Sequence, residues 1–114
     1  MVLYAAADLI FATRIKGTGE AVGVPCRPVR SVEMLEARLA DSEVRALLLD
    51  LDAPELALEL LGRLRGPGAG EAERAVRILA WGPHVETELF RQARAAGADE
   101  VMTRGAFTAG LPEL

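Results

Sequence analysis

The sequence predicts an α/β protein built on a doubly wound sheet of five parallel strands. Short apolar runs alternate with amphipathic segments five times along the chain, at intervals of roughly 20 to 25 residues. The stretch 44–54 contains an apolar run of about five residues that stops at Asp50, with Pro54 four positions later, as is typical of a buried parallel strand ending in an acidic loop. Binding sites in open α/β sheets gather at the carboxyl ends of the strands, so Asp50 is the first candidate functional residue and Asp52 the second.

Length and composition favour a single domain spanning residues 1–114. A hydrophobic content of 51% is enough to build one core at this length, and aromatic residues make up only 4% of the chain. The 13 basic residues are scattered and are outnumbered by 17 acidic ones, which gives a formal net charge of −4. We therefore expect no nucleic-acid partner, because such binding needs a concentrated positive surface.

The single cysteine and the N-terminal segment point to the cytoplasm. Cys26 has no second cysteine to pair with, so neither a disulfide nor a Cys-rich metal site can form. The first residues lack the basic region of a secretory signal, and no stretch approaches the roughly 20 apolar residues of a membrane span. We expect a cytoplasmic protein that does not enter a membrane.

The first two strands are expected at 2–7 and 24–29. Asp8 ends the first run and can cap a helix over about 9–22. Two prolines in the second run remove backbone donors, which confines that strand to a sheet edge and agrees with the strand order 2-1-3-4-5. Ser31 then caps a helix that reaches about residue 40.

The second half of the chain repeats this alternation and ends early. Pro54 opens a helix with leucines at every fourth position, and a glycine-rich polar loop runs from Gly66 to Arg74. The remaining expected elements are a strand at 76–81, a helix from about 85 to 96 closed by Gly97, and a strand at 100–103. The remainder has room for about two helical turns, so the last helix must be shortened.

Two segments of the chain, 47–54 and 97–104, follow a known pattern. The first reads Leu47-Leu48-Leu49-Asp50-Leu51-Asp52-Ala53-Pro54 and the second Gly97-Ala98-Asp99-Glu100-Val101-Met102-Thr103-Arg104. They resemble the phospho-acceptor strand and the Gly-Ala-Asp-Asp-Tyr-Leu-x-Lys segment of the response-regulator receiver domain, the flavodoxin-like module of bacterial two-component signalling. The resemblance extends along essentially the whole chain, and it implies that Asp50 occupies the phospho-acceptor position.

The chain departs from the receiver pattern where that family binds its metal ion. Receivers follow the first strand with an acidic pair that holds Mg²⁺, and here those positions are Ala6 and Ala7, with Asp8 one step further on. Mg²⁺ requires near-octahedral oxygen coordination, so Asp8 and Asp50 would form at most a weak metal site. We expect no cofactor, and Mg²⁺ only if the Asp50 site is functional.

The groups that assist phosphoryl transfer in the family also differ here. Trp81 or Gly82 stands where receivers carry a Thr or Ser hydroxyl, and Gly105 replaces a Pro. The family's Lys aligns with Arg104, which keeps the charge but is a planar fork instead of a compact ammonium. Because phosphoryl transfer depends on positioning and charge neutralisation, these changes predict a pseudo-receiver, in which the fold is retained and the phosphorylation switch is lost or weakened.

Three cleft residues have alternative structural roles. Asp50 could simply cap the helix that follows it, since Asp is a favoured N-cap residue. Trp81 could lie in the core or pack over Asp50. His84, the only histidine, could contact a phosphate or carboxylate near Asp50, respond to pH, or fill the start of the next helix by bonding a backbone group.

Three functional hypotheses follow. None of them makes the chain an enzyme, because the sequence contains no evident catalytic constellation. The first is a stand-alone signalling module that acts without phosphorylation through a protein partner, such as a histidine kinase or an output protein, or through a homodimer formed near Leu111 and Leu114. The second is a working phospho-acceptor that uses Asp50. The third is a small-molecule-binding α/β module that uses the cleft between Asp8, Asp50, His84 and Arg104.

Overall fold

A computed structural model describes residues 1–7, 9–82 and 88–110 of the chain. These residues form one five-stranded parallel sheet in the order β2-β1-β3-β4-β5, which confirms the predicted flavodoxin-like order. The strands are β1 (Val2–Ala5), β2 (Cys26–Pro28), β3 (Ala46–Asp50), β4 (Arg77–Gly82) and β5 (Glu100–Thr103). The proline-containing β2 lies at the edge, where its missing backbone donors leave no gap inside the sheet.

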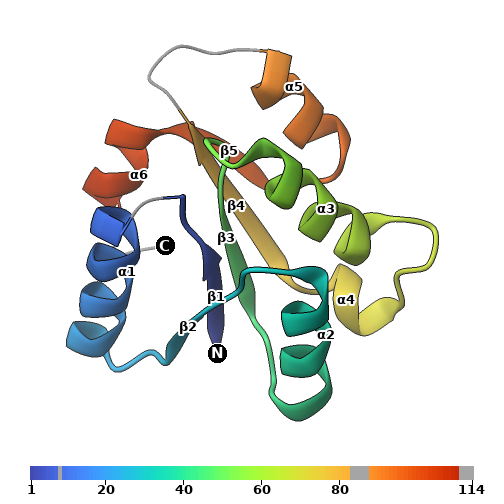
Figure 1. Cartoon of the computed structure of the whole chain (residues 1–114), viewed down its shortest axis with the longest axis horizontal. Coiled ribbons are helices and arrows are strands. Elements are labelled where there is room, and N and C mark those ends of the chain that lie inside the picture. Colours follow the sequence, from blue (N-terminus) through green and yellow to red (C-terminus); the bar gives the residue numbers. More distant parts are fainter. Residues whose placement is uncertain (8, 83–87, 111–114) are drawn as a thin grey trace.

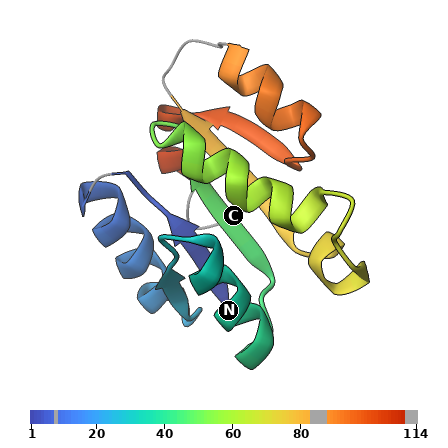
Figure 2. The ribbon, with the colours of Figure 1, turned by 45° about the vertical axis from the view of Figure 1, so that its right-hand side comes forward.

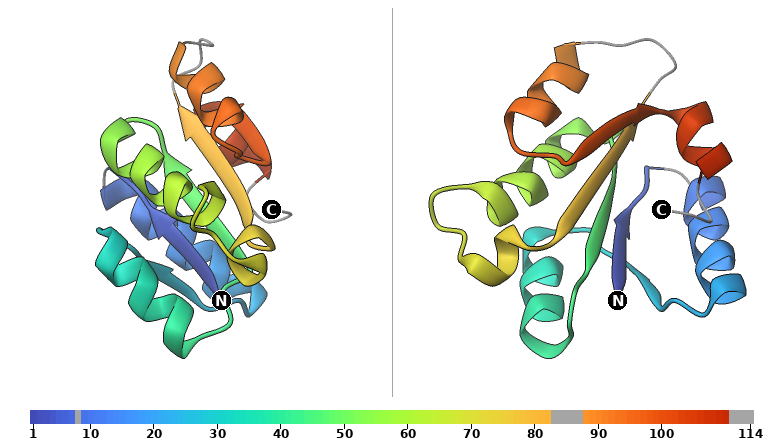
Figure 3. Two further views of the ribbon diagram at one scale, coloured as in Figure 1. Left: turned by 90° about the vertical axis from the view of Figure 1, so that its right-hand side faces the viewer. Right: turned by 180° about the vertical axis from the view of Figure 1, so that it is seen from behind.

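Helices cover both faces of the sheet (Figures 1 and 3). One face carries α1 (Leu9–Val22) and the short α6 (Arg104–Gly110). The opposite face carries α2 (Val32–Asp41), α3 (Pro54–Arg65) and α5 (Glu88–Ala95), and Figure 2 shows α3 lying across the sheet on this side. This two-sided cover explains why the inner strands are apolar along their length instead of alternating between apolar and polar residues. None of the described helices is long and apolar enough to span a membrane.

Alternate residues of each strand contribute to separate cores on the two faces. Leu47, Leu49 and Ala80 pack against α2, α3 and α5, whereas Leu48 and Trp81 pack against α1 and α6. Asp50 follows Leu48 in this alternation and is the register partner of Trp81 on β4. The side chain of Asp50 therefore belongs to the α1/α6 side of the sheet.

The predicted loop from Gly66 to Arg74 is wrong in part, because the helix α4 forms at Glu71–Arg74. Acidic residues in its first turn and Arg74 in its last turn suit the helix dipole. Two arginines of α3 also hold this segment. Arg63 pairs with the Glu73 carboxylate at 3.2 Å, and Arg65 donates to the backbone oxygens of Glu73 and Val76 at 3.1 and 2.6 Å.

The caps of the other helices follow the sequence closely. Ser31 Oγ accepts from the N–H of Met34 at 3.1 Å and begins α2. Gly97 ends α5 with a φ of +110°, a conformation that glycine adopts without a Cβ clash. The described part of the last helix runs over Arg104–Gly110 and begins directly after β5. The first part of the predicted fourth helix, and Leu111 and Leu114, lie outside the described residues.

Candidate functional site

The carboxyl ends of four strands bring the predicted cleft residues to one edge of the sheet. Asp50 is the last residue of β3 and Asp52 follows it, Trp81 lies near the end of β4, and Arg104 follows β5 directly. Two other predicted site residues, Asp8 and His84, lie outside the described part of the chain. The described site therefore consists of the β1–α1 loop, the β3–α3 loop, the end of β4 and the β5–α6 junction.

Asp50 is the one buried charged side chain among the described residues, with 1% of its surface exposed. Its Oδ2 accepts a hydrogen bond from the backbone N–H of Ala7 at 2.8 Å. Its Oδ1 accepts from the backbone N–H of Asp52 at 2.9 Å. Two backbone donors thus replace the water that a buried carboxylate loses, and they tie Asp50 to the loops after β1 and β3.

The alternative in which Asp50 caps the following helix is wrong. The N-cap residue of α3 is Ala53, which makes no side-chain capping bond, and the helix begins at Pro54. Proline has no N–H to satisfy at this position, so the helix needs less help from a cap. Asp50 instead organises the turn before the helix, where its backbone oxygen accepts from the N–H of Ala53 at 3.1 Å.

Asp52 and Arg104 form an ion pair across the mouth of this edge. The two side chains are 38% and 41% exposed, so solvent screens much of their attraction. The guanidinium carbon of Arg104 also lies 5.4 Å from the centroid of the Phe11 ring, within the range of a cation–π contact. The positive group that aligns with the receiver Lys is therefore engaged with Asp52 and with an aromatic ring of α1.

Trp81 lies in the core, which confirms one of the two alternatives predicted for it. It is fully buried, and its ring stacks on Phe107 of α6 with a centroid distance of 4.2 Å and an interplanar angle of 8°. Phe11 of α1 belongs to the same aromatic cluster, and its ring centroid lies 5.8 Å from that of Trp81. Within the described residues the indole Nε1 has no hydrogen-bond partner. The aromatic stack thus joins β4 to both helices of this face.

Sequence reasoning missed the role of the Thr103 hydroxyl. Thr103 is the last residue of β5, and its Oγ1 accepts from the N–H of Ala106 at 3.2 Å, so it begins α6 as an N-cap. A Thr three residues before the N–H that donates such a bond is a recognisable capping signal, and it was available in the sequence. The hydroxyl lies close to Arg104 in the chain but serves the helix.

The described residues do not fit a Mg²⁺ site of the receiver type. Each oxygen of Asp50 already accepts a backbone N–H, and Asp52 pairs with the Arg104 guanidinium. Ala6 and Ala7 supply no carboxylate, and no group of three metal-ligating side chains gathers within residues 1–7, 9–82 and 88–110. Mg²⁺ would have to compete with these donors for its ligands.

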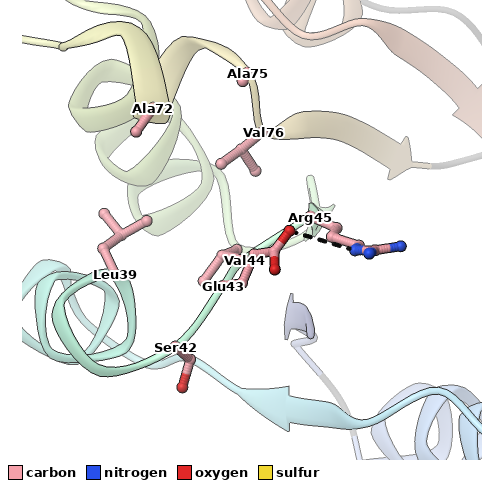
Figure 4. Close-up of a pocket in the computed structure, with 8 residues that line it drawn as sticks. All are labelled: Leu39, Ser42, Glu43, Val44, Arg45, Ala72, Ala75 and Val76. Atoms are coloured by element: carbon pink, nitrogen blue, oxygen red, sulfur yellow. Dashed lines mark ion pairs between the residues drawn. The ribbon is translucent and has the colours of Figure 1, made fainter.

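A hollow of about 500 Å³ lies at the amino ends of β3 and β4, the end of the sheet opposite to Asp50, between the end of α2 and α4 (Figure 4). Leu39, Ala72 and Val76 face its interior, which makes most of its wall apolar. Its two charged residues, Glu43 and Arg45, pair with each other at 3.8 Å. This hollow shares no residue with the Asp50 site.

Comparison with solved structures identifies the fold. The chain matches the signal receiver domain of a response regulator from Bermanella marisrubri with a TM-score of 0.78, at 19% sequence identity over 98% of this chain and 91% of that one. It matches a response regulator from Thermotoga maritima with a TM-score of 0.76, at 18% identity over 98% and 90%. A response regulator from Burkholderia pseudomallei, whose structure carries a phosphorylated aspartic acid, a calcium ion and citrate, matches with a TM-score of 0.75 at 18% identity, over 96% of this chain and 62% of that one.

No protein-family model and no curated protein sequence matches the chain. The likeness to the solved structures therefore rests on shape, at identities below 20% in all three cases. The chain has the fold of a response-regulator receiver domain.

Proposed function

We propose that this chain is a receiver-like module of two-component signalling that acts through protein contacts, without phosphorylation of Asp50 and without catalysing a reaction. The receiver fold and the position of Asp50 at the end of β3 support the signalling role. The state of the Asp50 carboxylate, which is 1% exposed and accepts a backbone hydrogen bond at each oxygen, supports the absence of a phosphorylation switch.

A phospho-acceptor must present a carboxylate oxygen in line with the leaving group of the donor. Asp50 Oδ2 faces the N–H of Ala7 and Oδ1 faces the N–H of Asp52. A phosphoryl group on either oxygen would displace one of these bonds, and the displaced N–H would have to find a new acceptor, without which the loss is roughly 1–3 kcal/mol. The loop after β1 would have to move before the reaction could occur.

The charge that develops during phosphoryl transfer also lacks stabilisation here. Positioned cations and hydrogen-bond donors supply most of the rate in such reactions. Arg104 is paired with Asp52, and neither Trp81 nor Gly82, the two candidates for the position of the receiver hydroxyl, carries a hydroxyl. Restoring a hydroxyl at position 81 would remove the centre of the aromatic cluster, so the loss of this group is built into the core.

The partner in this proposal is a protein, either a histidine kinase, an output protein or a second copy of the chain. The surface that we assign to it comprises α5, β5 and α6, because β5 is an edge strand whose outer side is open to contact in the described part of the sheet. Exposed charged residues of α5, among them Glu88 and Arg91, would form the rim of such a contact. Sedimentation at increasing concentration separates the homodimer from a partner of another kind.

Intact-mass spectrometry under denaturing conditions tests the phosphorylation part of the proposal. The wild-type chain, Asp50→Asn and a receiver domain known to accept phosphate are incubated with Mg²⁺ and acetyl phosphate. We expect the mass of one added phosphoryl group in the known receiver only. Thermal melting with Mg²⁺ and beryllofluoride gives a second readout, in which only the known receiver should be stabilised.

A phosphoryl gain in the wild type that is lost in Asp50→Asn would overturn the proposal and establish the second candidate, a working phospho-acceptor. The position of Asp50 at the carboxyl end of β3, next to the acidic loop, is the observation that favours this candidate. The phosphorylated aspartic acid in the Burkholderia pseudomallei protein is a precedent for that chemistry on this fold.

A further inference from the structure

We propose that a second site, formed by α1 and the edge strand β2, binds a small phosphate-bearing molecule. The site is a hollow of about 270 Å³ lined by Tyr4, Ala12, Thr13, Lys16, Pro28 and Arg30. It lies beside the β1–β2 pair, and Figure 2 shows α1 running alongside these two strands. This inference goes beyond the signalling role, because no residue of the Asp50 site contributes to it.

The fold places these side chains together for simple geometric reasons. Tyr4 and Pro28 are register partners on β1 and β2, so they form one continuous floor. Ala12 and Lys16 are one helical turn apart on α1 and therefore occupy the same face above that floor. Arg30, two residues after the end of β2, is an exposed residue that also lines the hollow.

The charge of the hollow is positive and uncompensated. Lys16 and Arg30 both line it, none of its six residues is acidic, and neither cation forms an ion pair within the described residues. Arginines elsewhere, such as Arg63 and Arg77, do pair with carboxylates. Two positive charges held at a concave surface raise the local concentration of anions, even on a chain with a net charge of −4.

Two hydroxyl groups add donors to this positive site. Tyr4 is 5% exposed and lines the hollow. Its phenol oxygen makes no hydrogen bond to any described residue. The Thr13 hydroxyl likewise has no partner in the described part of the chain. The phenol oxygen is not among the buried polar atoms that lack a partner, so it is exposed to the hollow, where it can donate to a ligand oxygen.

This set of donors identifies the ligand class. An ammonium, a planar guanidinium and two hydroxyls can together meet the several oxygens of a phosphate group, and charged partners make such bonds short and strong. The Tyr4 ring, the Ala12 methyl and the Pro28 ring offer apolar contact for a short carbon body. The volume of about 270 Å³ lies below the usual range for drug-sized ligands, so a small phosphate monoester fits better than a nucleotide.

Lys16 is the only lysine of the chain, which gives the test a specific reporter. Reductive methylation with a labelled methyl source keeps its charge and adds one side-chain NMR signal besides that of the N-terminal amine. Glycerol 3-phosphate, inorganic phosphate and adenosine monophosphate are titrated separately at constant ionic strength. We expect a saturable shift of the Lys16 signal with glycerol 3-phosphate, a weaker affinity for inorganic phosphate and the weakest for adenosine monophosphate.

Variants decide whether the hollow itself binds the phosphate. Arg30→Gln should weaken the binding of glycerol 3-phosphate about 10-fold or more, since one charged hydrogen-bonding partner is lost, and Tyr4→Phe should weaken it several-fold. Arg27→Gln is the matched control, because Arg27 is an exposed arginine of β2, three residues before Arg30, that does not line the hollow. Its affinity should stay within about twofold of the wild type.

Three results would overturn the proposal. These are a shift that does not saturate, an equal loss of affinity in Arg27→Gln and Arg30→Gln, or wild-type binding in Arg30→Gln and Tyr4→Phe together. If inorganic phosphate binds more tightly than the monoester, the hollow is an anion site whose ligand is free phosphate. The titration measures non-covalent binding at this hollow, whereas the mass measurement detects covalent phosphorylation of Asp50. A failure of the phosphate-site proposal is therefore distinguishable from a failure of the proposed function.

Discussion

The backbone N–H of Ala7 and the carboxylate of Asp50, 43 positions apart in the chain, are joined by a 2.8 Å hydrogen bond at the carboxyl edge of the sheet. The resemblance to receivers implies that Ala7 aligns with a position where that family carries an acidic side chain for Mg²⁺. Here the loop after β1 contributes a backbone donor to Asp50. In this chain Asp50 holds two loops together, and its role is at least partly structural.

We predict that Asp50→Asn lowers the free energy of unfolding by about 1–3 kcal/mol, because an amide nitrogen would face one of two buried backbone donors that now have a carboxylate acceptor. Urea unfolding followed by circular dichroism measures this loss. The matched control is Asp52→Asn, in which an exposed carboxylate two residues away changes in the same manner. That variant should lose less than about 1 kcal/mol, since its pair with Arg104 is solvent-screened. Equal stability of Asp50→Asn and the wild type would contradict the structural role.

The short helix α6 depends on the burial of one ring. Its described part has seven residues, too few for an isolated helix to be stable, and Phe107 is its fully buried anchor against Trp81. We predict that Phe107→Ala costs about 3–5 kcal/mol and that Phe107→Leu, which refills part of the space, costs clearly less. Trp81 is the only tryptophan, so its emission follows the unfolding of this cluster directly. A wild-type midpoint in Phe107→Ala would mean that the stack does not hold α6.

The sheet order and most helix bounds could be predicted because they depend on local patterns. Apolar runs, the prolines of β2, the Ser31 cap and the glycine after α5 each act through their own segment. The same holds for Asp50, which the pattern placed at the end of the central strand. These features need no knowledge of what lies across the fold.

Features that depend on distant partners could not be predicted. The helix α4 is held by Arg63 and Arg65 of α3, and the alanine-rich loop after β1 contributes to the site through a backbone N–H and not through any side chain. The stack of Trp81 with Phe107 joins residues of different elements whose types alone predict only burial. The capping role of Thr103 is different, since its local signal was present and was not used.

Cys26 should react slowly with alkylating agents in the folded chain. Burial raises the pKa of its thiol above the ordinary value, and its Sγ donates to the Val24 oxygen at 3.6 Å. The folded state therefore prefers the protonated form, so this contribution to stability is present below the ordinary pKa and is lost as the pH rises through the raised one. Iodoacetamide labelling at pH 8, read by mass spectrometry, should be several-fold slower than in urea. Equal rates in the folded and unfolded chain would argue against this protection.

The acid limb of the stability curve should depend on Glu73, the residue that links α4 to α3. The backbone N–H of Glu73 itself and then the Arg63 side chain hold the pKa of this carboxyl below its ordinary value of 4.5. A lowered pKa in the folded state stabilises the fold above the ordinary value, and that contribution is lost as the pH falls through the lowered one. We therefore predict that wild type and Glu73→Gln differ in unfolding free energy at neutral pH and converge in the acid range below pH 4.5.

The matched control for this prediction is Glu71→Gln, which removes an exposed carboxylate from the same helix without touching Arg63. Urea midpoints at a series of pH values give the difference curves of both variants. The curve of urea midpoint against pH for Glu71→Gln should run nearly parallel to that of the wild type. If the Glu73→Gln curve also stays parallel down to the most acid point, Glu73 titrates with the same pKa in both states. The Arg63 contact would then hold α4 without contributing to the pH dependence.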